Sequence, residues 1–115
     1  MENINRAISL DENNILFYDN RSNLWRKMEQ YYKAIDDYNM ILSIHPDNLK
    51  SLINRAFCYA KLEKYDLAVK DYTSILKFED TNTHALYNRA ISYDKIGRME
   101  NVKILFLFIF FFSSL

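Results

Sequence analysis

Three asparagines and three lysines recur along the chain at a spacing of 34 residues, and their side chains could contact a peptide. The asparagines are Asn20, Asn54 and Asn88, and the lysines, seven positions further on in each case, are Lys27, Lys61 and Lys95. Seven residues are nearly two turns of an α-helix, so both columns would lie on one helix face. A carboxamide donates and accepts hydrogen bonds, so the asparagines could hold a peptide backbone without reading its side chains. Solvation on an exposed face is the other interpretation, and for the lysines it is the favoured one.

Apolar residues lie beside these two columns and would suit the apolar side chains of a ligand. They are Ile53, Phe57, Tyr87 and Ile91. The sequence therefore predicts one binding surface. Its candidate residues are Asn20, Asn54, Asn88, Lys27, Lys61, Lys95, Phe57 and Tyr87.

No motif for catalysis or for metal binding stands out. The two histidines, His45 and His84, are far apart in the sequence, and the single Cys58 offers no ligand pair at zinc spacing. Gly97 is the only glycine, so a glycine-rich phosphate loop is excluded. The sequence predicts neither an enzyme nor a cofactor, and no small-molecule substrate.

The composition favours a folded helical protein. Lys plus Arg and Asp plus Glu both number 15, and this balance argues against a nucleic-acid binder, which needs a basic surplus. Half of the residues are hydrophobic, which excludes a disordered chain. One Gly and one Pro suit helices joined by short turns. The lone Cys58 and the lack of a signal peptide predict a reducing, intracellular and cytoplasmic setting.

The whole chain repeats with the same period. Among the aligned pairs are Tyr31 with Tyr65, Ala34 with Ala68, Asp37 with Asp71, Tyr38 with Tyr72, and Ile41 with Ile75. Within each unit the apolar residues recur at helical spacing in two stretches separated by a short polar turn. A helix pair this short cannot bury its apolar stripe alone, so the units are expected to stack on one another.

This pattern resembles the tetratricopeptide repeat. Counted from Ile15, that family has a large residue at place 4, a small one at 8, an aromatic at 11, Ala at 20, an aromatic at 24 and Pro at 32. The first unit supplies Tyr18, Ser22, Trp25, Ala34, Tyr38 and Pro46. The second supplies Leu52, Ala56, Tyr59, Ala68 and Tyr72, with Asp80 in place of Pro, and the third supplies Leu86, Ala90 and Tyr93.

The resemblance implies an all-α fold, a right-handed superhelical solenoid of antiparallel helix pairs. The expected helices are approximately 3–10, 15–28, 31–44, 49–62, 65–78 and 83–96, with a further candidate at 99–112. The chain divides into the second half of a truncated preceding repeat (1–14), two full units (15–48 and 49–82), a partial third unit (83–101) and a hydrophobic tail (102–115). It is therefore expected to be a piece of a longer array.

The tail is unlike the rest of the chain, since no polar side chain occurs from Ile104 to Phe112. A membrane-spanning helix needs about 20 apolar residues, and this run is less than half of that. A native second helix packed on the array is a second interpretation. Translated intron or another non-native extension is the third, because Val102 stands where the repeat expects Ala.

Resemblance to the family puts the asparagine face on the inner, concave side of the superhelix. The predicted function is a protein-interaction scaffold that binds an extended peptide or a partner protein there. The alternative is a segment of a longer repeat protein, or of the arm of an enzyme, with no ligand of its own. A known subfamily clamps the acidic C-terminus of chaperones, but its required arginine falls on Asn54 in one register and on Asn88 in the next. A chaperone clamp is therefore not predicted, and neither is a membrane partner.

An arginine column at place 7 is expected to form ion pairs with an aspartate column at place 23. The arginines are Arg21, Arg55 and Arg89. The expected pairs join neighbouring units, Arg55 with Asp37 and Arg89 with Asp71.

Overall fold

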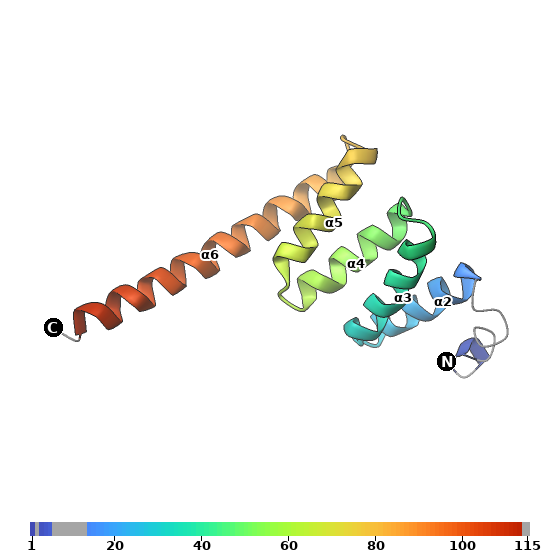
Figure 1. Ribbon diagram of the computed structural model, residues 1–115, viewed down its shortest axis with the longest axis horizontal. Helices are drawn as coiled ribbons and strands as arrows, with labels where there is room; N and C mark the ends of the chain where they lie inside the picture. Colours follow the sequence, from blue (N-terminus) through green and yellow to red (C-terminus); the bar gives the residue numbers. More distant parts are fainter. Residues whose placement is uncertain (2, 6–13, 114–115) are drawn as a thin grey trace.

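The computed structural model describes residues 1, 3–5 and 14–113, and nearly all of them are helical (Figure 1). Five helices follow one another: α2 (Ile15–Lys27), α3 (Tyr31–Ile44), α4 (Leu49–Lys61), α5 (Tyr65–Phe78) and α6 (Thr83–Ser113). Each packs against the next along the chain, and the described part contains no strand. The prediction of an all-α solenoid of helix pairs is confirmed. Of the helix expected at 3–10, residues 3–5 are helical and the remainder lies outside the described residues.

An asparagine at the equivalent place precedes and caps the first helix of each unit. The side chain of Asn14 accepts from the backbone N–H of Leu16 at 3.0 Å. In the same way Asn48 accepts from Ser51 at 3.0 Å, and Asn82 accepts from Ala85 at 2.9 Å. An asparagine oxygen at this position satisfies a helix N–H that has no intrahelical partner.

The turn within each full unit depends on one residue in the left-handed region. Glu29 and Glu63 both have φ of 59° and lie between the two helices of their unit. At this conformation the helix stops and the chain reverses direction, although a side chain other than glycine is strained there.

Two clusters form the core, each centred on one full unit and each including a residue of a neighbouring unit, such as Cys58 in the first and Leu42 in the second. The small residues at places 8 and 20 are fully buried, and they are Ser22, Ala34, Ala56 and Ala68. Their size lets the two helices of a unit approach closely, and large side chains such as Tyr38 and Ile75 fill the flanking space.

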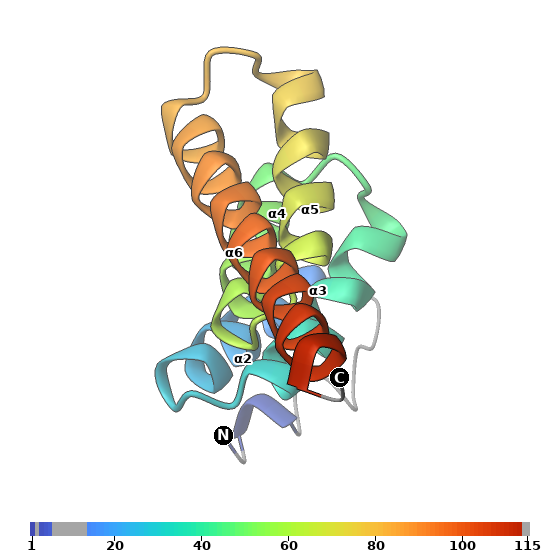
Figure 2. The same ribbon diagram turned by 90° about the vertical axis from the view of Figure 1, so that its left-hand side faces the viewer.

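Helix α6 corrects the prediction of two helices at 83–96 and 99–112. The chain stays helical through Gly97, which occupies the place of Glu29 and Glu63, and it continues to Ser113. An ion pair between Asp94 and Arg98 at 2.9 Å spans this position at helical spacing, and a second between Glu100 and Lys103 at 3.5 Å follows it. The C-terminal half of α6 projects beyond the other helices (Figure 1), and in the view turned by 90° it lies in front of them (Figure 2). Residues 101–113 are exposed.

In the two full units the arginine pairs with the aspartate of its own unit, so the expected pairing between units was wrong. Arg21 Nε donates to Asp37 Oδ2 at 2.9 Å, and Arg55 Nε donates to Asp71 Oδ2 at 2.8 Å. Each guanidinium donates to both carboxylate oxygens. The antiparallel hairpin of a unit brings place 7 opposite place 23 of the same unit, which explains the correction. The hydrogen bond to Asp37 raises the pKa of Arg21.

Each arginine also reaches the second helix of the preceding unit, at place 25. Arg55 Nη1 donates to Asn39 Oδ1 at 2.8 Å, and Arg21 Nη1 donates to Asn5 Oδ1 at 2.9 Å. Arg89 Nη1 donates to Thr73 Oγ1 at 3.3 Å. In the third unit, however, Leu105 occupies place 23, so the repeat supplies no carboxylate to Arg89 there.

Within the described residues, no helix combines the length and the apolar character that crossing a membrane requires.

Candidate functional site

A groove lies between α4 and α6, with α5 contributing to its wall, and it is called here the α4–α6 groove. Its volume is about 260 Å³. It is lined by Phe57, Ala60 and Lys61 of α4, Tyr65 and Tyr72 of α5, and Asn88, Ile91 and Lys95 of α6. Four of the eight candidate residues, Phe57, Lys61, Asn88 and Lys95, therefore line one surface.

The groove combines an apolar centre with cationic and amide groups. Phe57 and Ile91, both 38% exposed, come from facing helices. The Lys61 ammonium lies 5.5 Å from the centre of the Phe57 ring, a cation–π distance. The Asn88 carboxamide donates to the His84 carbonyl at 2.8 Å, which fixes its orientation on α6. An apolar side chain flanked by an acidic group would match this arrangement.

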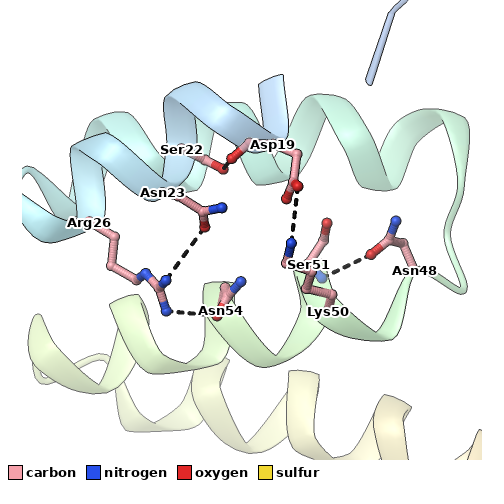
Figure 3. Close-up of polar contacts among 8 residues, drawn as sticks. All are labelled: Asp19, Ser22, Asn23, Arg26, Asn48, Lys50, Ser51 and Asn54. Carbon is pink, nitrogen blue, oxygen red and sulfur yellow. Dashed lines mark hydrogen bonds and ion pairs between the residues drawn. The ribbon is translucent and has the colours of Figure 1, made fainter. Parts of the chain in front are cut away.

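The asparagine column is not uniform, because its three members have different surroundings. Asn20 is exposed on α2, whereas Asn54 is buried at 8% exposure and Asn88 is half-buried. The Asn54 oxygen accepts from Arg26 Nη1 at 2.9 Å, and the Arg26 side chain also donates to Asn23 at 3.4 Å (Figure 3). Asn54 thus joins α4 to α2.

A second polar contact between α2 and α4 joins Lys50 to Asp19, with 3.1 Å between Nζ and Oδ2 (Figure 3). Sequence reasoning did not single out Asp19, Asn23 or Arg26 as members of this surface. Their places, 5, 9 and 12, have the helical spacing of the same face, and that spacing was the available signal. This ion pair and the hydrogen bonds of Arg26 make the α2 part of the face polar, whereas the apolar groove residues Phe57 and Ile91 come from α4 and α6.

Besides Asn20 and Asn54, two further candidate residues lie outside the groove lining. Tyr87 is 69% exposed on α6, and Lys27 is exposed in the last turn of α2. Both remain on the first helices of their units, so they can contact only a ligand that extends beyond the groove.

Cys58 and His45, which were considered as metal ligands, lie in different parts of the fold. Cys58 is fully buried in the first core cluster, and His45 follows the end of α3. No cluster of three or more His, Cys, Asp or Glu side chains that could hold a metal occurs in the part of the chain that the structure describes.

Burial raises the pKa of the Cys58 thiol to about 11. We expect a thiol reagent at pH 8 to modify the native protein at least about a hundredfold more slowly than the urea-unfolded chain, because thiolate is scarce and shielded. Because the unfolded chain ionises first, stability should fall as pH rises from about 9 towards 11. Equal labelling rates in the native and unfolded states would contradict the buried position.

Comparison with protein families decides the nature of the second unit. The tetratricopeptide repeat family model matches residues 49–82, which are α4, α5 and the turn between them. Residues 49–82 are a tetratricopeptide repeat. The first unit is a similar helix pair on one side of it, and α6 packs against α5 on the other.

Solved structures share this fold over most of the chain. A tetratricopeptide repeat protein from Parabacteroides merdae has 27% sequence identity and a TM-score of 0.76 over 91% of this chain. The chain spans 41% of that protein's length. No relative was found among curated protein sequences.

Two further structures are peptide complexes. The second tetratricopeptide domain of human RPAP3, in complex with the HSP70 peptide SGPTIEEVD, has 24% identity and a TM-score of 0.72, covering 80% of this chain and 77% of that one. The first such domain of Spaghetti (RPAP3), bound to the HSP90 peptide SRMEEVD, has 20% identity and a TM-score of 0.76, covering 82% and 75%. At these identities the likeness concerns the fold.

Proposed function

We propose that this chain is a protein-interaction scaffold that binds an extended peptide along the first helices of its units, with the α4–α6 groove as the main contact. The groove carries the proposal, because it joins apolar residues, an oriented carboxamide and two lysines on one surface. The peptide complexes of RPAP3 with the same fold support a peptide as the ligand.

The composition of the groove indicates the kind of peptide. Phe57 and Ile91 would contact one apolar side chain, and the available volume suits a single residue of that kind. Lys61 and Lys95 would attract an acidic residue close to it. Asn88 would hydrogen-bond the peptide backbone, and Asn20, Lys27 and Tyr87 would contact a longer peptide. In this proposal Asn54 acts on the ligand indirectly, by positioning Arg26.

The test is a peptide-array screen followed by titration of the best peptide. Removing both groove charges, with Lys61→Gln and Lys95→Gln, should weaken the binding of an acidic peptide roughly tenfold and reduce its dependence on salt. Ile91→Ser should cost about 1 kcal/mol of binding free energy, or about fivefold in Kd. The matched control is Lys70→Gln with Lys77→Gln, which removes two exposed lysines of α5 that do not line the groove.

A peptide whose affinity responds equally to the groove and control variants would contradict the proposed site. If the screen finds no peptide, the result would favour the alternative of a structural segment. Amidation of the peptide C-terminus should leave affinity unchanged, because the arginine that a chaperone clamp requires is replaced by Asn54 or Asn88. A large loss on amidation would instead indicate a clamp for C-terminal carboxylates.

A further inference from the structure

Helix α6 exposes the stripe that the first helices of the other units bury. Leu52 and Ala56 of α4 are 4% and 0% exposed, beneath α5. Their counterparts Leu86 and Ala90 are both exposed, and so is Tyr93 at place 11. We call Leu86, Ala90 and Tyr93 the α6 stripe. In the other units the second helix covers this stripe, so the third unit lacks a second helix on its surface.

The tail has the side chains that such a second helix needs. Places 20, 24, 27 and 28 carry Ala34, Tyr38, Ile41 and Leu42 in α3, and Ala68, Tyr72, Ile75 and Leu76 in α5. All of these are buried except Leu76, which is half-buried. In the tail the same places carry Val102, Phe106, Ile109 and Phe110, and all four are exposed. The apolar residues of the tail therefore match the pattern of a second helix in the repeat register.

A straight helix cannot fold this tail onto its own stripe. The stripe and the tail belong to one continuous helix, and the left-handed turn that reverses the chain at Glu29 and Glu63 is absent at Gly97. The stripe of one molecule can, however, accept the tail of another. Ala90 and Val102 are equidistant in sequence from Ile96. Two antiparallel α6 helices related by a two-fold axis near Ile96 would therefore bring each stripe opposite the partner's tail, with places 8 and 20 together as Ala56 and Ala68 are in the second unit.

We propose that two copies of this chain associate through antiparallel α6 helices, and that each tail serves as the second helix of the partner's third unit. Such an exchange is isologous and needs no contacts beyond those of the repeat itself. Arg98 lies two residues from this axis, and its charge is offset because it is already paired with Asp94.

The available surface is sufficient for a stable dimer. If about five tail side chains and the three of the stripe become covered in each copy, at roughly 100 Å² apiece, the pair buries roughly 1,600 Å², the size of a specific interface. A solvent-exposed apolar helix of this length is otherwise typical of an interaction site.

The first test measures mass and proximity in the full-length chain. Sedimentation equilibrium should give twice the 13.8 kDa of the single chain. A chain with Ala90→Cys mixed with a chain carrying Val102→Cys should form a mixed disulfide dimer on oxidation, because Ala56 and Ala68 at the same places are packed in one cluster. Ser43→Cys on the exposed part of α3 is the control partner and should not cross-link. Burial of Cys58 keeps the background low.

The second test separates this register from non-specific apolar association. Leu105→Asp restores the carboxylate at place 23 and should preserve or tighten the dimer by pairing with Arg89 of the other copy. Ile109→Asp places a charge at the buried place 27 and should weaken the dimer about a hundredfold or more. Equal weakening by both variants would overturn the proposal.

Other outcomes also overturn it. If one chain carrying both Ala90→Cys and Val102→Cys forms its disulfide at monomer mass, the tail folds back at Gly97 within one molecule. A monomer at all concentrations, or one whose tail binds neutral phospholipid vesicles in preference to a second copy, would equally exclude the dimer.

Discussion

Replacing Arg55 by alanine is expected to lower the free energy of unfolding by about 2–3 kcal/mol, because the change leaves a buried carboxylate without its partner. The Asp71 side chain is 4% exposed, and both of its oxygens accept from Arg55. The same change removes the bond to Asn39, which joins α4 to α3 of the preceding unit. Urea unfolding followed by circular dichroism measures the loss.

The third unit offers a matched control for this prediction. Arg89 occupies the same place but bonds Thr73 at 3.3 Å, and the repeat gives it no aspartate, so Arg89→Ala should cost no more than about 0.5–1 kcal/mol. A double-mutant cycle of Arg55→Ala with Asp71→Asn should give a coupling energy of at least about 1 kcal/mol. Equal losses at the two arginines, together with a coupling near zero, would show that the ion pair is not what stabilises the unit.

Ile75→Ala should be the more damaging of two identical substitutions, with a loss of about 3 kcal/mol in the free energy of unfolding. Ile75 is fully buried in the second core cluster, and truncation leaves a cavity between α4 and α5. Ile109 occupies the same place but is 53% exposed on α6. Ile109→Ala should change unfolding by less than about 0.5 kcal/mol when measured at concentrations where the chain is monomeric.

A loss at Ile109 as large as that at Ile75 would mean that the tail packs within the single chain. Thermal unfolding at several protein concentrations separates the two effects, since only an association makes the Tm depend on concentration.

Helices α2 to α5 could be predicted from the sequence almost to the residue, because each place in the repeat has a distinct steric requirement. Only small residues such as Ala56 and Ala68 fit where the two helices of a unit touch, and Asn48 caps the helix that begins beside it. Such local constraints can be read without knowing the neighbours.

The relations between helices could not be read in the same way. The 34-residue period shows that arginines and aspartates form columns, but it does not say which unit supplies the partner, and Arg55 in fact pairs within its own unit. The period likewise places Asn20, Asn54 and Asn88 on one face, but not the Arg26 side chain that engages Asn54. The groove was predicted in part, because periodicity identifies a face and not the contacts across it.

The absence of a turn at Gly97 could not be predicted, because the sequence there is compatible with both a turn and a helix. Gly97 suits a left-handed turn better than the glutamates of the other units do, yet glycine is also tolerated inside a helix at a cost of about 1 kcal/mol. The helical conformation of Gly97 is favoured by the strong helix formers around this residue and by the ion pair between Asp94 and Arg98.

The way each arginine joins its unit to the preceding one also determines where the native molecule opens. Arg21 and Arg55 each join three helical segments, whereas Arg89, among the described residues, bonds only Thr73 of α5. The third unit therefore lacks the bond that closes the other two units on themselves. At concentrations where the chain is monomeric, amide hydrogens should exchange with deuterium slowest in α3 and α4 and fastest in α6 beyond Asn101, through fraying that does not require global unfolding. A gradient of protection along one uninterrupted helix would show that α6 is held where it packs against α5 and is free beyond that contact.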